Sequence, residues 1–179
     1  MFDKSSARVA VVIDDPSLRF NASHFLSFPV QSDSALDAWA AEPVHGHDFH
    51  IRLRIEGPLD ESSCVVDFLA VIRAIKTIAR DWDHDLILAR NTRGARFITS
   101  GDKTTILYEV APKLQYTVPT DSIRWLDGSN VSAEEIALEL LAELLEKFDS
   151  EGLLYFERDA YRFELRLEEA PGCYVEVSC

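Results

Sequence analysis

Apolar and polar residues alternate along several stretches of the chain, as they do in β-strands with one buried face. The clearest run covers 47–56, where every second residue is apolar, and Gly57 and Pro58 end it. This run predicts a half-buried strand. Four other segments are predicted to be extended, at 8–13, 17–28, 161–167 and 174–177.

Two longer stretches carry the helical period instead. In 65–82 and again in 133–148, apolar residues recur at steps of three and four, which places them on one face of a helix. Ser132 and Glu135 have the spacing of a capping box, in which a hydroxyl and a carboxylate satisfy N–H groups at the helix start. The predicted buried faces are Phe68, Leu69, Ile72, Ile75 and Ile78 in the first helix, and Ile136, Leu140, Leu141, Leu144 and Phe148 in the second.

The remaining segments have weaker patterns. We expect a hairpin from 104–110 and 114–118, reached through a connection at 91–102. Residues 32–44 are predicted to form a long loop with room for one helical turn. The order is then strands, helix, hairpin, helix, strands, which indicates an α+β protein with antiparallel strands.

Composition and charge narrow the class of partner. The chain has 179 residues, the size of one domain, and its 47% apolar and 27% charged residues are typical of a folded globular protein. A formal net charge of −13 opposes binding to the phosphate backbone of a nucleic acid or to an anionic membrane. We therefore expect neither nucleic acid nor membrane as a partner.

Targeting and redox signals predict a cytoplasmic protein. No apolar run reaches the roughly 18 residues that span a bilayer, and residues 1–6 are polar with no apolar h-region after them. Cys64, Cys173 and Cys179 are an odd number of cysteines, and their spacing fits neither a disulfide framework nor a zinc knuckle. We expect reduced thiols.

Three histidines are candidates for a metal site. His45 and His47 stand two apart at the start of the predicted strand, so both side chains leave the same face. His24 lies in the preceding extended segment, where antiparallel pairing would bring it opposite the pair, whereas His50 has the other parity. Three histidines with an open fourth position are typical of catalytic zinc, although an isolated His-x-His often binds nothing.

Six short segments stand in a recognisable order from Phe20 onward. They are FNASHF at 20–25, HGHDF at 45–49, VVDF at 65–68, Asp83-His84 within DWDHDLIL, NVSAEEIA at 130–137 and EEAPG at 168–172. The ordered set resembles the 6-pyruvoyltetrahydropterin synthase and 6-carboxytetrahydropterin synthase family, in which the comparable segments include FSASH, HGHNY, DHKxLN, PTAENIA and ETPT. Each segment alone is a weak signal, but the order covers most of the chain.

The resemblance implies the tunnelling fold, an antiparallel β-sheet with two helices packed on one face. Subunits of this fold join their sheets edge to edge into trimeric barrels, and two trimers commonly stack, so a homo-oligomer and specifically a hexamer is implied. Barrel closure would pair the edge strands that a monomer leaves open. One domain of this family is implied over 1–179, with a hairpin insertion at about 91–129.

The resemblance further implies a pterin site. In this family Zn²⁺ polarises the side-chain oxygens of a dihydropterin, an Asp-His pair transfers protons, and a glutamate anchors the pterin ring. Without the resemblance, the residues favour a solvated turn for the Asp-His pair and an exposed strand end for the glutamate. The implied zinc ligands are His24, His45 and His47, the implied acid–base pair is Asp83 and His84, and the implied anchor is Glu169.

The chain departs from the family at the catalytic cysteine, which normally stands four residues before the first histidine of HGH. Ala41 holds this position, and residues 1–63 contain no cysteine. An alanine transfers no proton, so the base must be another group. Glu42 is our first candidate, because family members with glutamate in place of the cysteine cleave the dihydroneopterin side chain in an aldolase-like reaction. Cys64, before the first helix, and Cys173, expected to be buried in the last strand, are weaker candidates.

Two functions remain open at this point. The main hypothesis is a zinc-dependent lyase that breaks a carbon–oxygen or carbon–carbon bond in the side chain of a 7,8-dihydropterin, either dihydroneopterin or its triphosphate. The alternative is a pterin-binding homologue without catalysis. Arg90, Arg93 and Arg96 form the densest basic group and would suit a triphosphate, but such runs are more often solvated loop charges.

Overall fold

The computed structural model describes residues 8–29, 39–108 and 113–179, and the chain divides into two compact units. Strands β2 (Arg19–His24) and β5 (His45–Gly57) and helices α1 (Phe68–Trp82) and α2 (Ala133–Glu151) pass from one unit into the other. Each of these four elements therefore contributes some of its residues to one unit and the rest to the other. Unit 1 comprises 1–20, 49–81 and 137–179, and unit 2 comprises 21–48 and 82–136.

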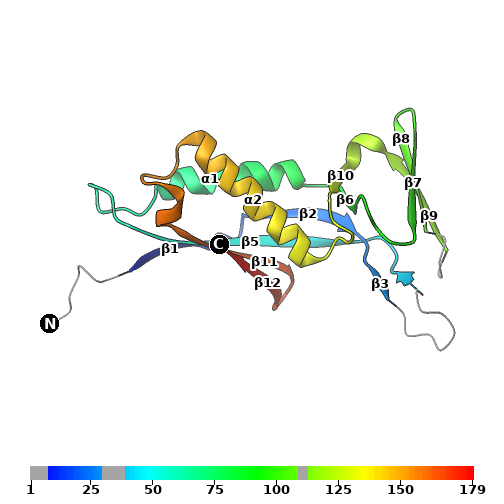
Figure 1. The fold of residues 1–179 in the computed structure, drawn as a ribbon, viewed down its shortest axis with the longest axis horizontal. Helices are drawn as coiled ribbons and strands as arrows, with labels where there is room; N and C mark the ends of the chain where they lie inside the picture. The colour runs from blue at the N-terminus through cyan, green and yellow to red at the C-terminus, as the bar shows by residue number, and fades with distance from the viewer. Residues whose placement is uncertain (1–7, 30–38, 109–112) are drawn as a thin grey trace. The chain divides into compact units, whose positions relative to one another are not determined.

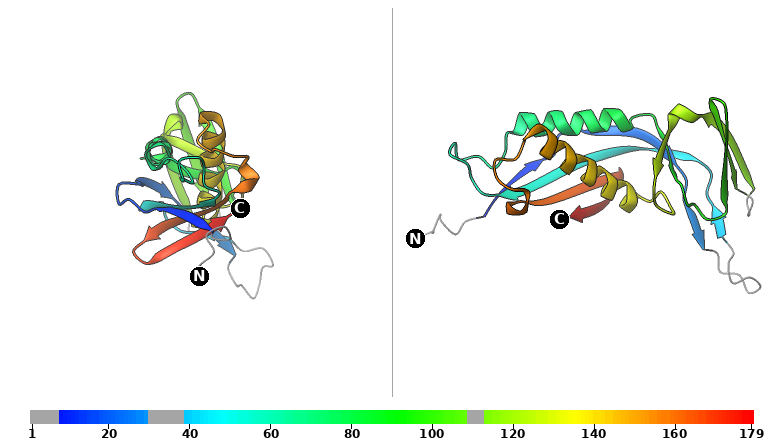
Figure 2. Two further views of the ribbon diagram at one scale, coloured as in Figure 1. Left: turned by 90° about the vertical axis from the view of Figure 1, so that its left-hand side faces the viewer. Right: turned by 45° about the horizontal axis from the view of Figure 1, so that its top comes forward.

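Unit 1 is a β-sheet with both helices on one face (Figures 1 and 2). Strand β1 (Val9–Ile13) pairs antiparallel with β5, and so does β11 (Arg162–Ala170). Strand β12 (Cys173–Ser178) pairs antiparallel with β11 at the edge, and the 3-10 turn η3 (Arg158–Ala160) precedes β11. These elements confirm the sequence predictions for the two ends of the chain and for the strand that begins at 47.

The core of unit 1 lies between this sheet and the helices. The alternation in β5 buries Phe49, Ile51, Leu53 and Ile55 completely, and each such side chain contributes about 1.5–3 kcal/mol. The ring centroids of Phe148 on α2 and of Phe163 on β11 lie 6.0 Å apart. The whole predicted face of the second helix is buried, namely Ile136, Leu140, Leu141, Leu144 and Phe148.

The predicted face of the first helix is correct only in part. Ile75 and Ile78 are buried, but Phe68 and Leu69 are 54% and 66% exposed. The periodicity of this helix allows two overlapping stripes, and the one that packs includes the small side chains of Ala74 and Ala79, which permit a close approach to the sheet. The full buried stripe is Val71, Ala74, Ile75, Ile78, Ala79 and Trp82.

Unit 2 contains parallel strands that the sequence did not predict. Strand β6 (Leu86–Ala89) runs parallel to β10 (Ile123–Leu126), and β2 joins β6 in parallel at Ser23. The fold is therefore α+β with two helices and a mixed sheet, whereas only antiparallel strands were predicted. Strands β6 and β10 are four residues long, which is too short for an alternation to stand out in the sequence.

Two further strand groups lie in unit 2. Strands β7 (Ala95–Ser100), β8 (Lys103–Tyr108) and β9 (Leu114–Pro119) form an antiparallel sheet, which the 3-10 turn η2 (Thr120–Ser122) follows. The described part of the predicted hairpin is confirmed as β8 and β9. The prediction of an irregular connection at 91–102 is wrong for β7, because the exposed, polar-rich sequence of that strand hides its pairing with β8.

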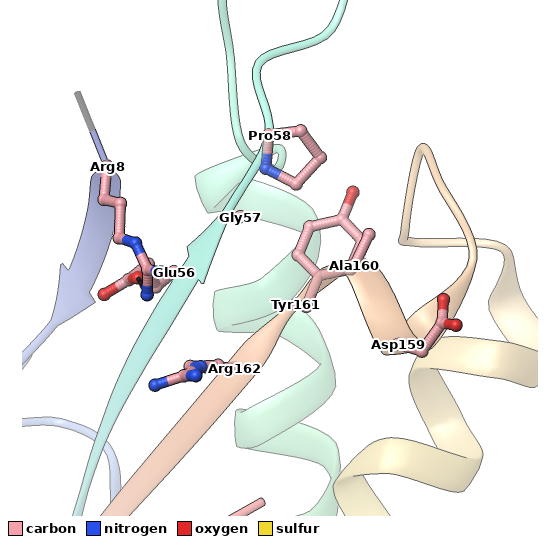
Figure 3. Close-up of a pocket in the computed structure, with 8 residues that line it drawn as sticks. All are labelled: Arg8, Glu56, Gly57, Pro58, Asp159, Ala160, Tyr161 and Arg162. Atoms are coloured by element: carbon pink, nitrogen blue, oxygen red, sulfur yellow. Dashed lines mark hydrogen bonds and ion pairs between the residues drawn. The ribbon is translucent and has the colours of Figure 1, made fainter. Parts of the chain in front are cut away.

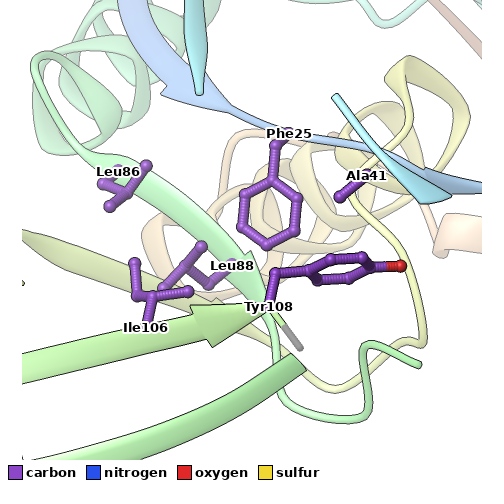
Figure 4. Packing of buried hydrophobic residues seen from close by; sticks show 6 residues of the cluster. All are labelled: Phe25, Ala41, Leu86, Leu88, Ile106 and Tyr108. Carbon is purple, nitrogen blue, oxygen red and sulfur yellow. The ribbon is translucent and has the colours of Figure 1, made fainter. Parts of the chain in front are cut away.

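The loop predicted at 32–44 is also wrong in part. Strand β3 (Ser27–Pro29) pairs antiparallel with β4 (Trp39–Ala41), while residues 30–38 lie outside the described residues. Ala41 packs with Phe25, Tyr108 and three aliphatic residues in the apolar cluster of unit 2 (Figure 4), and it is 3% exposed. Position 41, where the resemblance would place a cysteine, is thus a core position.

Among the described residues, neither helix is long and apolar enough to cross a membrane. The prediction of one domain with an insertion at about 91–129 stays a prediction.

Candidate metal centre and acid–base pair

Three histidine rings meet in unit 2. His24 ends β2, while His45 and His47 open β5, where the period of two sends both rings to one face. The ring centroids of His24 and His45 are 4.7 Å apart, those of His24 and His47 5.2 Å, and those of His45 and His47 4.9 Å. One ligand atom from each ring lies within 4.8 Å of the other two, so the three residues could hold a metal ion.

Backbone carbonyls orient two of the three rings. Nδ1 of His24 is 2.6 Å from the carbonyl oxygen of Val131, and Nδ1 of His45 is 3.0 Å from that of Pro43. A carbonyl oxygen only accepts, so Nδ1 carries the proton in each neutral ring and Nε2 carries the lone pair. Histidines that bind metals are typically held in this way. The donor set therefore fits an ion that prefers imidazole ligands, such as Zn²⁺.

Asp83 and His84 form a hydrogen-bonded pair directly after α1. Nδ1 of His84 is 2.8 Å from Oδ2 of Asp83. Oδ1 of Asp83 accepts the Asn21 N–H at 2.7 Å, and the His84 N–H donates to the Asn21 carbonyl at 2.6 Å. The Asn21 N–H, and after it the nearby His84 ring, hold the pKa of Asp83 below its usual value. Asp83 thus stays ionised and can stabilise a protonated imidazole.

The turn that carries His84 has a strained backbone and is stabilised by contacts of the residues beside it. The φ angle of His84 is 72°, in the left-handed region that few non-glycine residues adopt. Next to it, Asp85 accepts a hydrogen bond from Nε of Arg124 at 3.0 Å, and the Arg124 guanidinium lies 4.4 Å from the centre of the Trp82 ring. The side chain of His84 is nevertheless 80% exposed. Strain kept at an exposed titratable residue is typical of functional sites.

His84 and His47 line the same pocket, which has a volume of about 340 Å³. A Cβ on Gly46 would lie 3.3 Å from Ser23 Oγ and 3.4 Å from the Ala22 carbonyl oxygen, so the glycine allows β2 to approach closely. A candidate metal ligand and the candidate acid–base group therefore face one cavity. Its lining residues are Asn21, Ala22, Ser23, Gly46, His47, Asp48 and His84.

Glu42 lies next to the histidines. Its Oε1 is 3.8 Å from Nε2 of His45 and accepts the Leu26 N–H at 2.9 Å. The Glu42 N–H in turn donates to the Leu26 carbonyl at 3.1 Å. Ala41 instead packs in the apolar cluster. Of these two adjacent positions, Glu42 is the one whose side chain approaches a candidate ligand.

Glu169 occupies an irregular position in unit 1. Glu168 pairs with Tyr174 and Ala170 with Cys173, so Glu169 is the extra residue where the register of β11 and β12 shifts. Such a bulge redirects a side chain out of the regular alternation and occurs often beside binding sites. Glu168 accepts the Gly172 N–H at 2.9 Å and so closes the turn. Of the two glutamates, Glu168 is therefore the one that stabilises the turn.

The remaining candidates from the sequence are two cysteines, as alternative bases, and the basic group at 90–96. Cys64 and Cys173 belong to unit 1 and are exposed. The prediction that Cys173 is buried is wrong, because it begins the edge strand β12, none of whose residues is buried. Nε of Arg90 is 3.1 Å from Oδ1 of Asp127, and the guanidinium of Arg93 lies 5.0 Å from the centre of the Trp39 ring.

A second hollow, in unit 1, has a volume of about 410 Å³ (Figure 3). It is lined by the end of β5 and by residues 159–162, and the side chain of Arg8 lies beside Glu56, 3.4 Å from it. The ring of Tyr161 packs against Gly57 (Figure 3). None of the predicted site residues lines this hollow.

Sequence reasoning missed the backbone groups of the site. The Val131 carbonyl contacts His24 from 107 residues away, and the amide group of Asn21 holds the Asp-His pair. Every residue has a backbone carbonyl and nearly every one an N–H, so no residue type marks these roles. The segments FNASHF and NVSAEEIA were the only signal, because they contain Asn21 and Val131.

Comparisons with known proteins match most of the chain. The family model of 6-pyruvoyl tetrahydropterin synthase matches residues 16–178. A Pyrococcus horikoshii protein named as a candidate 6-carboxy-5,6,7,8-tetrahydropterin synthase is 25% identical over 159 residues, which are 89% of this chain and 85% of that protein.

Solved structures show the same fold. The 6-pyruvoyltetrahydropterin synthase of Plasmodium vivax superposes with a TM-score of 0.80 and 20% identity, covering 97% of this chain and 99% of that one. A variant of the Plasmodium vivax synthase, in which alanine replaces a glutamate described as a catalytic residue, superposes equally well, also with a TM-score of 0.80. Together, the fold and the family model place this chain in the class of pterin synthases. This chain belongs to the 6-pyruvoyl tetrahydropterin synthase family.

Proposed function

We propose that this protein is a zinc-dependent lyase that acts on the side chain of a 7,8-dihydropterin, dihydroneopterin or its triphosphate. One observation carries the proposal: three histidines with ligand atoms within 4.8 Å of one another include His47, which shares a pocket with the Asp83-His84 pair. Metal ligands and an acid–base group on one cavity are what side-chain proton transfer requires.

His24, His45 and His47 would hold the metal ion. Bound there, Zn²⁺ supplies Lewis acidity that polarises hydroxyl and carbonyl oxygens of the substrate side chain. The Val131 and Pro43 carbonyls keep Nε2 of His24 and of His45 unprotonated and hold the two rings in orientation for the ion. Three protein ligands leave a position open for substrate, as catalytic zinc sites do.

His84 is proposed as the group that moves a proton. Its Nδ1 is bonded to Asp83, so the exposed Nε2 is the nitrogen that exchanges protons with substrate. Asp83 is held ionised by the Asn21 N–H and stabilises the imidazolium that forms when Nε2 accepts a proton. The hydrogen bond between Nδ1 and Asp83 orients the ring.

Glu42 is proposed as the second base, in the role of the missing cysteine. Its carboxylate lies 3.8 Å from His45, close enough to reach a group held by the metal ligands. A variant of the related Plasmodium vivax synthase carries alanine in place of a catalytic glutamate, so a glutamate serves as a catalytic residue in that protein. A carboxylate that removes a hydroxyl proton favours aldolase-like carbon–carbon cleavage of dihydroneopterin.

Two expectations from the family remain proposals. Glu169, at its bulge, is proposed to bind the pterin ring through N–H groups. The barrel of joined subunits is proposed as the assembled form, with a hexamer of two stacked trimers as its size. Among the described strands, β12 has a neighbour on one side only, which is consistent with closure by a second copy.

The test is incubation of zinc-loaded protein with dihydroneopterin and with its triphosphate, with the products identified by mass. A truncated pterin or a rearranged side chain supports the lyase, and its mass distinguishes cleavage from elimination. No turnover of either compound, together with retained pterin binding, would instead establish the non-catalytic homologue.

A further inference from the structure

The hydrogen bond between His24 and Val131 depends on a loop. Val131 lies between β10 and α2, and its carbonyl oxygen receives the Nδ1 proton of His24 at 2.6 Å. Both residues are buried, at 1% and 2% exposure. A carbonyl displaced beyond hydrogen-bond distance would leave the ring free to rotate or to change tautomer. Whatever holds Val131 therefore also sets the state of His24.

Asn130 clamps this loop to the segment that carries His24. Its Nδ2 donates to the Ser27 carbonyl at 2.8 Å, and its Oδ1 accepts the Ser27 N–H at 3.0 Å. An amide side chain that satisfies both groups of one residue fixes distance and orientation together, as a β-ladder does. Ser27 stands three residues after His24, and Asn130 directly precedes Val131.

The partner of the clamp is itself fixed. Ser27 is 1% exposed, and its hydroxyl lies 3.0 Å from the Arg93 carbonyl and 2.9 Å from the Tyr108 hydroxyl. On the other side of Val131, the Ser132 hydroxyl accepts the Glu135 N–H and caps α2. Val131 is therefore held between a helix start and a clamp on β3.

We infer that Asn130 is a positioning residue for the metal centre: through Ser27 and Val131 it keeps His24 in the Nδ1-protonated tautomer with Nε2 aimed at the ion. This inference rests on the proposed metal site. The side-chain hydrogen bonds of Asn130 run to Ser27, so its effect on His24 passes through the Val131 carbonyl.

The matched comparison is Asn130→Ala against Asn91→Ala. Nδ2 of Asn91 donates to the Asp127 carbonyl at 3.1 Å, so it ties the other end of the same loop without contacting β3. Zinc affinity is measured by competition with a coloured chelator. We expect Asn130→Ala to weaken zinc binding by about 10–100-fold, as loss of an outer hydrogen bond does. Asn91→Ala should stay within about twofold of the unmodified protein.

A second readout needs no metal. The nitrogen chemical shifts of His24 in the metal-free protein report which nitrogen carries the proton. We expect protonated Nδ1 in the unmodified protein and in Asn91→Ala, and a mixture of tautomers in Asn130→Ala. If the unmodified protein binds no zinc, the proposed function fails, while these shifts still decide the role of Asn130.

Two results would overturn the inference. One is a folded Asn130→Ala variant with a lowered melting temperature but unchanged zinc affinity and an unchanged His24 tautomer, which would show a purely structural role. If Asn130→Ala does not fold, Asn130→Asp decides instead, because it keeps the acceptor for the Ser27 N–H and loses the donor. Unchanged zinc affinity in Asn130→Asp would then be the contradicting result.

Discussion

Nδ1 of His84 lies 2.8 Å from Oδ2 of Asp83, and the backbone of Asn21 holds both residues, through its N–H on Asp83 and its carbonyl on the His84 N–H. The carboxylate thus has one oxygen for the imidazole and one for β2. Its ionisation and the placement of His84 are therefore coupled, which leads to predictions for stability and for catalysis.

Replacing Asp83 with Asn should reveal a pH-dependent contribution to stability. The pKa of Asp83 is lowered from its usual value of 3.8, so the ionised form stabilises the folded state above that value. This contribution is lost as the pH falls through the lower folded-state pKa. Urea unfolding over a pH series should show the unmodified protein more stable than Asp83→Asn at neutral pH, with the gap closing in acid. A gap that is constant with pH would contradict this account.

Two substitutions of His84 should separate its chemistry from its backbone strain. We expect both His84→Ala and His84→Gly to lower kcat by about 10²–10⁴-fold, since both remove the proton-transfer group. His84→Gly should be the more stable of the two by about 1 kcal/mol, because glycine adopts the positive φ without strain. Turnover assays and thermal unfolding measure the two effects. A His84→Ala variant with normal kcat would remove His84 from the mechanism.

Removal of zinc should lower the stability of the folded protein. A ligand that binds only the folded state stabilises it by about 2.7 kcal/mol when its free concentration is 100 times Kd. We expect a chelator to lower the melting temperature, and His24→Ala to abolish both zinc binding and this response. His50→Ala is the control, because Nε2 of His50 lies by the Asp15 carbonyl in unit 1, at 3.1 Å. Equal zinc content in the two variants would refute the histidine triad.

Substitutions at the adjacent residues Ala41 and Glu42 should have different effects. Glu42→Gln keeps an oxygen for the Leu26 N–H but loses the base, so turnover should fall by about 10²-fold or more while zinc stays bound. Ala41→Cys places a thiol in the apolar cluster and should not by itself create synthase activity. Product masses and rates test both. Turnover by the double variant Ala41→Cys, Glu42→Gln would show that the thiol does reach the substrate.

Gly57→Ala should destabilise unit 1 through a steric overlap. A Cβ at Gly57 would collide with the ring of Tyr161 (Figure 3). This ring is buried and its hydroxyl accepts the Tyr155 N–H at 3.1 Å, so it moves only at a cost. We expect a loss of about 1–3 kcal/mol in the free energy of unfolding. In a Tyr161→Leu background the same substitution should cost less, and an equal cost would exclude the overlap as its cause.

The sequence predicted best where a single element decides the pattern. The alternation over 47–56 identified the buried side of β5, and the face from Ile136 to Phe148 identified the buried side of α2. It failed where two elements must meet. The strand at 95–100 has no buried residue, so only its pairing with β8 defines it. Phe68 and Leu69 fit the helical period and are exposed nonetheless.

By itself, the sequence determined that His45 and His47 share a face, because side-chain direction in a strand alternates residue by residue. The tertiary structure alone decided that His24 meets them with Val131 at its back, that Asn21 holds the Asp83-His84 pair, and that Glu169 falls on a bulge. These relationships join residues far apart along the chain, and many of them use backbone groups that every residue type shares. A local pattern cannot specify such contacts, because they exist only after distant strands have paired.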